Sequence, residues 1–291
     1  MVSEPSLVHN AGIYVFKFTE EALNIRVDRI TEKSSNTSGE ITILTEAPGI
    51  NPFIHQARLN LTSTTARNAL AKYLNTRFEL DDWAGILEIV CAMVLRKHRE
   101  GEPVQTVGNL PARDSSKYRL SPLLVESEPN IFFGPGGVGK SYLACYISVL
   151  VQTGTDHHAL HPVQGNVLYL DWETSRYEID ERIKAVSRGM SLEGITIKHR
   201  FCSQSLASDI TRIQRMVVDT EAALVIVDSV GSACGGEPES AEVVLRYFMA
   251  LRSLKATTLS IDHVAKSGDS KTPFGSVFKI NAASLTSTAG T

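Results

Sequence analysis

From residue 130 onward, unbroken apolar runs alternate with segments whose apolar residues recur at helical spacing. The runs are NIFFG (130–134), NVLYLDWE (166–173), AALVIVDSV (222–230) and TTLSIDHV (257–264), with a shorter run near HRFCSQ (199–204). Apolar strands without alternation are buried on both faces, and strands separated by amphipathic helices pair in parallel. The pattern predicts an α/β domain with a five-stranded parallel sheet flanked by helices.

The first hundred residues show a different pattern. IYVFKF, ALNIRVDRI and GEITIL between Ile13 and Leu44 alternate only partly and enclose a polar turn, which predicts a small sheet of about three strands. Helical spacing follows over 63–74 and 81–98, and the second helix begins at acidic residues and ends in basic ones before Gly101. We expect residues 1–105 to form an α+β domain with an adaptor or oligomerisation role.

Residues 101–129 contain six of the turn-forming residues proline and glycine in a stretch with little periodicity, which predicts a linker there. The second domain should then span residues 106–291. Its last residues, SLTSTAGT, are small and polar and show no core periodicity.

The charge and the cysteine content limit which partners and which cellular compartment the sequence predicts. The 29 basic and 32 acidic residues give a net charge of −3, so any contact with nucleic acid must come from local loops rather than from a basic protein surface. Four widely spaced cysteines form no disulfide or zinc motif, which favours a reducing cytoplasm. No window reaches the roughly 18 apolar residues of a membrane span.

The string GPGGVGKS between the first apolar run and the following helix matches the phosphate-binding loop G-x-x-x-x-G-K-[ST]. Its glycines allow successive backbone N–H groups to face a phosphate, and the helix that follows adds the positive end of its dipole. In this loop we expect Lys140 to bridge the β- and γ-phosphates of ATP and Ser141 to bind Mg²⁺. The predicted nucleotide-binding residues are Gly134, Pro135, Gly136, Gly137, Val138, Gly139, Lys140, Ser141 and Tyr142.

Two other strand ends carry carboxylates where ligands bind in open α/β sheets. Asp228 ends LVIVD, and we expect it to hold Mg²⁺ together with Ser141. Glu173 follows a strand that we expect next to the strand of the phosphate-binding loop, where it would act as the general base for a water. Asp171 is the weaker candidate, with a role in the outer shell of the metal, and Trp172 between them serves either packing or base stacking.

Taken together, GPGGVGKS, VLYLDWE, VIVDS and LSIDHVAK resemble the RecA-like ATPases, in particular the RepA-like AAA ATPase and helicase group of plasmids, phages and prophages. The resemblance covers somewhat over half of the chain. Members of this family usually continue with further strands where this chain ends in SLTSTAGT, so the resemblance implies that the domain is truncated at its C-terminal end. It implies that Glu173 is the catalytic base and that His263 senses the γ-phosphate, although a structural histidine at a strand end remains the alternative. It also implies a hexameric ring acting on single-stranded DNA in replication or recombination.

The resemblance places DNA-binding loops after the last two predicted strands, at 231–240 and 265–282. Lys266, Lys271 and Lys279 in the second loop could contact DNA phosphates or a neighbouring subunit's nucleotide, or could be solvated lysines. Two functions remain open: an ATPase coupled to single-stranded DNA, and a nucleotide-dependent switch that binds a protein partner. A small-molecule kinase is disfavoured, because the order of the motifs points away from a phosphoryl acceptor.

Overall fold

The computed structural model describes residues 3–34, 36–102, 104, 106–108, 117–237 and 240–263, together with the backbone of 285–288. The chain divides into two compact units, Met1–Leu110 and Pro111–Thr291, and each has its own core. No helix in the described ranges is long and apolar enough to span a bilayer. The two units are described separately below.

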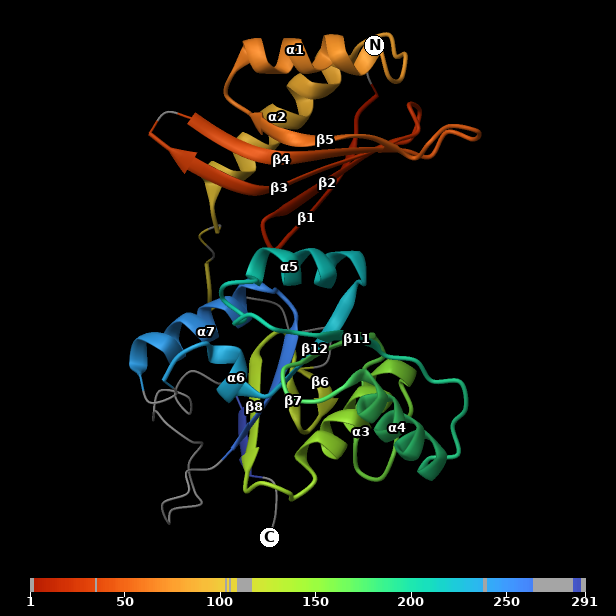
Figure 1. Ribbon diagram of the computed structural model, residues 1–291, viewed down its shortest axis with the longest axis vertical. Coiled ribbons are helices and arrows are strands. Elements are labelled where there is room, and N and C mark those ends of the chain that lie inside the picture. The colour runs from red at the N-terminus through yellow and green to blue at the C-terminus, as the bar shows by residue number, and fades with distance from the viewer. Residues whose placement is uncertain are drawn as a thin grey trace. The chain divides into compact units, whose positions relative to one another are not determined.

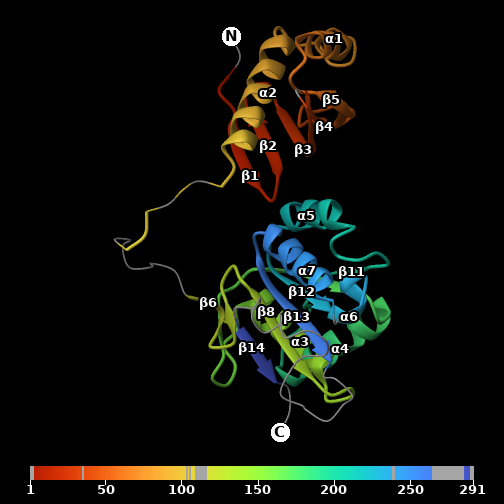
Figure 2. The same cartoon turned by 90° about the vertical axis from the view of Figure 1, so that its left-hand side faces the viewer.

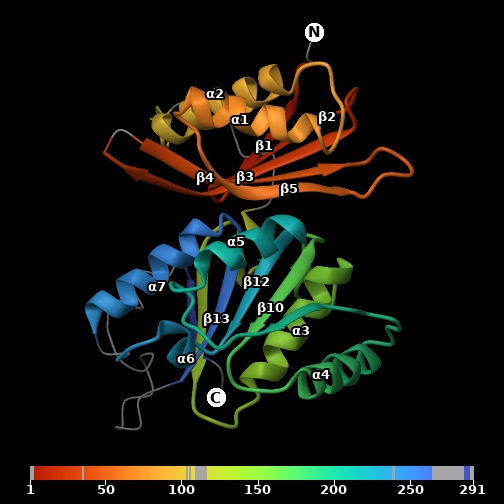
Figure 3. The same cartoon turned by 45° about the horizontal axis from the view of Figure 1, so that its top comes forward.

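The first unit is a five-stranded antiparallel sheet, in the order β1-β2-β3-β4-β5, with two helices packed on one face (Figure 3). Its elements are β1 Ser6–Asn10, β2 Ile13–Phe18, β3 Leu23–Lys33, β4 Asn36–Thr45, β5 Phe53–Asn60, α1 Thr64–Asn75 and α2 Trp83–Glu100. The sheet therefore has two strands more than the sequence predicts. The missed strands lie at its two edges, where few side chains are buried: β1 contains no buried residue.

Both predicted helices of this unit are confirmed, and their first turns explain where they begin. Ser63 accepts a hydrogen bond from the N–H of Ala66, and Asp82 accepts one from the N–H of Gly85, so each caps its helix. Trp83, fully buried in α2, packs on the sheet and donates its indole N–H to the carbonyl of Phe78.

The second unit is a six-stranded, all-parallel sheet in the order β11-β10-β12-β13-β8-β14 (Figures 1 and 2). Its strands are β8 Pro129–Gly134, β10 Asn166–Asp171, β11 Lys198–Phe201, β12 Ala222–Asp228, β13 Thr257–His263 and β14 Leu285–Thr288. The five-stranded parallel sheet is confirmed, and the tail adds a sixth strand that its polar sequence did not predict. The predicted linker was also too long, because β6 Tyr118–Ser121 and β7 Leu124–Val125 lie within it; β6 pairs with β7 on one side and with β9 His161–Pro162 on the other.

Helices cover both faces of this sheet and form two separate cores. On one face, α3 Lys140–Thr153 and α4 Arg176–Gly189 pack against side chains such as Tyr169 and Ile226. On the other face, α5 Ile210–Asp219, α6 Val230–Cys234 and α7 Ala241–Ser253 pack against side chains such as Leu170 and Val227. Apolar residues that alternate between the two cores explain why these strands are apolar without interruption.

Candidate nucleotide-binding site

The carboxyl ends of four strands meet at one edge of the parallel sheet. Asp171 on β10 lies opposite Asp228 on β12, and His263 on β13 lies opposite Gly134 on β8. This edge is where ligands bind in open parallel sheets. It brings the predicted residues of all four motifs into one place.

The phosphate-binding loop is the turn that joins β8 to α3 (Figure 1). Residues 135–139 are exposed, and Gly137 and Gly139 have φ angles of 79° and 88°, a left-handed conformation that favours glycine. α3 begins at Lys140 with Gly139 as its N-cap, so its free backbone N–H groups face the loop. The loop therefore has the conformation and helix terminus that an anion site requires.

Lys140 is buried, with 6% of its surface exposed, and it is held from three directions. Its ammonium donates to the carbonyl oxygens of Gly134 and Pro135 at 2.9 and 2.7 Å, and lies 3.4 Å from Nδ1 of His263. Burial lowers the pKa of Lys140, and the nearby carboxylates of Asp228, Glu173 and Asp262 oppose that shift. A desolvated ammonium is a strong partner for phosphate oxygens.

Asp228 lies at the end of β12 and is buried, with 3% of its surface exposed. The hydroxyl of Tyr169 donates to its Oδ2 at 2.7 Å. Burial raises the pKa of Asp228, and the neighbouring hydroxyl groups of Tyr169 and Ser141 only partly offset the effect. Ser141 and Asp228, the pair predicted for Mg²⁺, thus lie close to each other in the structure.

Glu173 reaches the loop across the end of β12. The sequence predicts that its strand lies beside the strand of the loop, and this prediction is wrong: β12 and β13 lie between β10 and β8. The backbone just after β10 stays paired with β12, since the N–H of Trp172 donates to the carbonyl of Asp228 at 2.8 Å. From there the side chain of Glu173 places Oε1 within 3.9 Å of Nε2 of His263 on β13.

Asp171 organises the segment that carries Glu173. Its Oδ1 accepts from the N–H groups of Glu173 and Thr174 at 2.9 and 3.0 Å, and its Oδ2 accepts from the Thr174 hydroxyl at 2.7 Å. The Nε2 of His199 on β11 lies 3.3 Å from the same Oδ2. Burial raises the pKa of Asp171, but these hydrogen bonds outweigh it and hold the pKa below its ordinary value. The geometry gives Asp171 a positioning role.

Three residues of this site carried no recognisable sequence signal. Ser229, which follows Asp228, donates its hydroxyl to Oε1 of Glu173. Tyr169 and His199 contact the two aspartates from neighbouring strands. Their roles depend on strand order, because they are separated by 28 to 59 residues from their partners. Pairing at such distances leaves no local motif.

The remaining predicted residues have more varied positions. Val138 is exposed in the loop, and Tyr142, also exposed, lies in the first turn of α3 with the Arg182 guanidinium 5.7 Å from its ring centre. Trp172 packs against the core and donates its indole N–H to the carbonyl of Gln204, which supports the packing alternative. The candidate loop 231–240 begins as α6 rather than as a loop, and Lys266, Lys271 and Lys279 lie outside the described residues.

The comparisons with known proteins place this site in a family. No curated protein is found that matches the chain. A family model described as the AAA domain matches residues 97–269, which is well over half of the chain and includes every residue of the site. The chain therefore belongs to the AAA domain family of P-loop ATPases.

Proposed function

We propose that this protein hydrolyses ATP with the help of Mg²⁺ and couples hydrolysis to single-stranded DNA. One observation carries the hydrolytic part: Oε1 of Glu173 lies 3.9 Å from Nε2 of His263, and Nδ1 of the same ring lies 3.4 Å from the loop lysine. A site that only binds a nucleotide needs the loop and its lysine, but it has no use for a carboxylate held in this position.

The residues present fit a magnesium ion. Mg²⁺ prefers oxygen ligands and is usually held by one or two protein groups together with substrate phosphates. Ser141 and Asp228 supply two such oxygens beside the loop, and the described residues contain no cluster of three or more histidine, cysteine or acidic side chains. A bound Mg²⁺ would neutralise phosphate charge, and it would offset the cost of burying the Asp228 carboxylate.

Different residues of the chain bind the phosphates, accept the proton and position the base. The loop amides and Lys140 bind and orient the phosphates, which places the γ-phosphorus for in-line attack. Glu173 accepts a proton from the attacking water, and the Ser229 hydroxyl and the Asp171-bound backbone fix its direction. His263 lies between Lys140 and Glu173 and can respond to a phosphate that displaces either contact.

The DNA part of the proposal rests on the resemblance to the RepA-like helicase group. In that group, hexameric rings bind the nucleotide between subunits and move on single-stranded DNA, and loops at the carboxyl ends of strands contact the DNA. The switch function remains the second candidate, because the net charge of −3 offers no general attraction for nucleic acid.

The test is ATP turnover by the full chain with and without a single-stranded oligonucleotide. Lys140→Ala reports contaminating activity, and Lys72→Ala, which removes an exposed lysine of the first unit, is the matched control. Stimulation by about tenfold, equivalent to about 1.4 kcal/mol of barrier, supports the coupled ATPase. Turnover that depends on Lys140 but is indifferent to DNA supports the switch, and turnover that persists in Lys140→Ala contradicts the site itself.

A further inference from the structure

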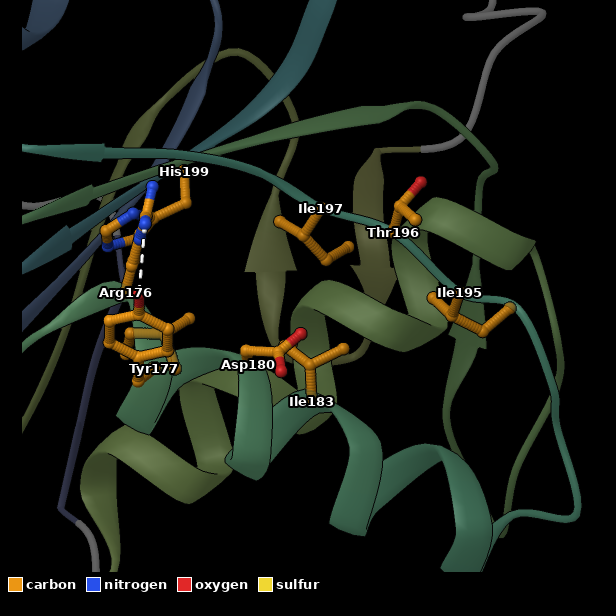
Figure 4. A pocket seen from close by; sticks show the side chains of 9 residues that line it. Arg176, Tyr177, Asp180, Ile183, Ile195, Thr196, Ile197 and His199 are labelled. Atoms are coloured by element: carbon orange, nitrogen blue, oxygen red, sulfur yellow. Dashed lines mark hydrogen bonds between the residues drawn. The ribbon is translucent and has the colours of Figure 1, made fainter.

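A cavity of about 330 Å³ lies on the α4 side of the sheet, and none of the residues assigned to ATP lines it (Figure 4). One wall is α4 and the other is the segment 195–199 that leads into β11. We call this cavity the α4 slot. Its lining residues are Arg176, Tyr177, Ile179, Asp180, Ile183, Ile195, Thr196, Ile197 and His199.

The two walls of the α4 slot are apolar and face each other. Ile179 and Ile183, both buried, line it from α4, and Ile195 and Ile197 line it from the opposite segment. Branched side chains on two facing walls accommodate a flat group between them. The volume is at the lower end of the range for small-molecule sites, which suits a single ring system rather than a larger ligand.

The polar groups gather at one end of the slot. Figure 4 shows Arg176, Tyr177 and His199 together there, with Ile195 at the other end. The Arg176 guanidinium lies 5.0 Å from the centre of the Tyr177 ring and donates to its hydroxyl at 3.0 Å. Guanidinium groups can only donate hydrogen bonds, and Arg176 has further N–H groups to offer a ligand.

The carboxylate of Asp180 is already engaged, since Lys184 lies 2.7 Å from it. The slot therefore favours a ligand whose edge accepts hydrogen bonds over one that carries a positive charge. A planar ring, apolar on both faces with acceptors along one edge, describes the heteroaromatic ring of a purine or a pyrimidine. Tyrosine and arginine planes at the rim are also groups on which such rings stack.

The polar end of the slot is connected to the catalytic segment in two ways. His199 lines the slot and contacts Asp171, and Asp171 holds the backbone N–H of Glu173. Arg176 begins α4 directly after the segment 171–175, and Ser175 caps that helix. A ligand that moves either His199 or the start of α4 also moves the support of Glu173.

We propose that the α4 slot is a second ligand site, separate from the phosphate-binding loop, that takes a purine-sized heteroaromatic ring and adjusts the position of Glu173. The effect on Glu173 rests on the proposed function, whereas binding in the slot does not. The two parts are tested separately, so an inactive ATPase would leave the binding result interpretable.

Binding is tested by titrating the fluorescent nucleoside 2-aminopurine riboside into the full chain. We expect saturable binding that is at least tenfold weaker in Ile197→Phe, which fills the slot, and nearly unchanged in Ile197→Val. Arg176→Gln, an exposed substitution that leaves the core intact, should weaken binding at least fivefold, with Arg188→Gln near the far end of α4 as its matched control. Equal binding to wild type and to both slot variants, or no binding, would overturn the proposal.

Competition experiments show whether the ring that fills the slot belongs to ATP in the phosphate-binding loop, to a free nucleoside or to a DNA strand. Lys140→Ala should bind the probe as wild type does, and Mg²⁺-ATP should displace the probe no more readily from wild type than from Lys140→Ala. Displacement by ATP in wild type but not in Lys140→Ala would mean that the base of the loop nucleotide fills the slot, and a separate site would be excluded. Free adenosine and a single-stranded oligo-dA distinguish a free base from one in a strand, and displacement by either supports the site.

The effect on Glu173 is tested by ATP turnover at saturating adenosine. We expect kcat to change at least twofold in wild type and in Arg188→Gln, but not in Arg176→Gln. Bound probe with unchanged kcat in wild type would disprove the link to Glu173.

Discussion

Nδ1 of His263 lies 3.4 Å from the ammonium nitrogen of Lys140. An ammonium group can only donate, so a hydrogen bond at this contact has Nδ1 as its acceptor. Nε2 on the other side of the ring faces Oε1 of Glu173 at 3.9 Å. The ring thus lies between the residue proposed to bind the phosphates and the residue proposed to activate water.

Replacing His263 by alanine should reduce kcat more than ATP affinity. The loop amides and Lys140 still bind the phosphates, but Glu173 loses a neighbour that fixes its direction. We expect kcat to fall about tenfold to a hundredfold, the size of a positioning effect of about 1.4 to 2.7 kcal/mol, with the Kd for a fluorescent ATP analogue within about threefold. An equal loss of affinity and kcat would assign His263 to binding instead.

Glu173→Gln should reduce turnover by about a hundredfold to ten-thousandfold, the usual contribution of a general base. Nucleotide binding should persist, because the amide keeps the volume of the side chain. Ser229→Ala, which removes the hydroxyl bonded to Glu173, should cost about tenfold. Glu181→Gln on the exposed side of α4 is the matched control. Single-turnover rates check this order, and full activity in Glu173→Gln would show that another group activates the water.

The phosphate-binding loop could be predicted from sequence because all of its chemistry lies in one string. The carboxylates Asp228 and Glu173 could be proposed because each follows an apolar strand, but their contacts could not. Glu173 lies near His263 and accepts a hydrogen bond from Ser229, and both contacts depend on the strand order. The order predicted from sequence, with β10 beside β8, does not include them.

Hydrophobic periodicity predicted the elements that bury one complete face and missed those that do not. β5 buries only Ile54 and Leu59, and β1 buries no side chain, so neither edge strand of the first unit has a clear alternation. α6 spans five residues, too few for a helical period to be visible. Edge strands and single helical turns are stabilised by backbone pairing and by tertiary contacts, which a residue pattern does not record.

Tyr169→Phe should destabilise the protein and weaken its response to Mg²⁺. The substitution removes the hydroxyl that donates to Oδ2 of Asp228, and a buried carboxylate that loses such a bond typically costs about 1.5 to 3 kcal/mol. Chemical denaturation measures the loss of stability. The Mg²⁺ concentration for half-maximal turnover shows whether the Asp228 carboxylate has moved, because a displaced carboxylate would bind Mg²⁺ more weakly. An unchanged Mg²⁺ response with lowered stability would limit Tyr169 to a structural role.

Asp228→Asn should abolish turnover supported by Mg²⁺ and raise the melting temperature of the nucleotide-free chain. Burial raises the pKa of Asp228, so the folded state takes up a proton at a pH where the unfolded chain is still ionised. The buried carboxylate therefore lowers the free energy of unfolding by its full amount at pH values above the raised pKa. This loss of stability becomes smaller as the pH falls from the raised pKa toward the ordinary pKa of aspartate. The stabilisation in Asp228→Asn should be largest at neutral pH and shrink on acidification, as thermal melts at several pH values would reveal. A constant difference across that range would contradict this origin.

The buried cysteines provide a separate probe of each unit. Burial raises the pKa of Cys91 to about 12, of Cys145 to about 12 and of Cys202 to about 11, and all four cysteines are free thiols. Thiolates are the reactive species, so native labelling by iodoacetamide at pH 8 should be slow and should require opening of the surrounding core. Labelling at increasing denaturant, read by mass spectrometry, reports those openings residue by residue.

Mg²⁺-ATP should protect Cys145 and Cys202 from this labelling but leave Cys91 unaffected. A ligand that binds only the folded state stabilises the core that contains its site, by about 2.7 kcal/mol at a hundred times its Kd. Cys145 and Cys202 lie in the two cores of the nucleotide-binding unit, whereas Cys91 lies in the core of the first unit, which consists only of residues from that unit. Lys140→Ala should remove the protection of Cys145 and Cys202 without changing Cys91. Equal protection of all three thiols would show that the two units unfold together, and the first unit would then belong to the same cooperative structure as the nucleotide site.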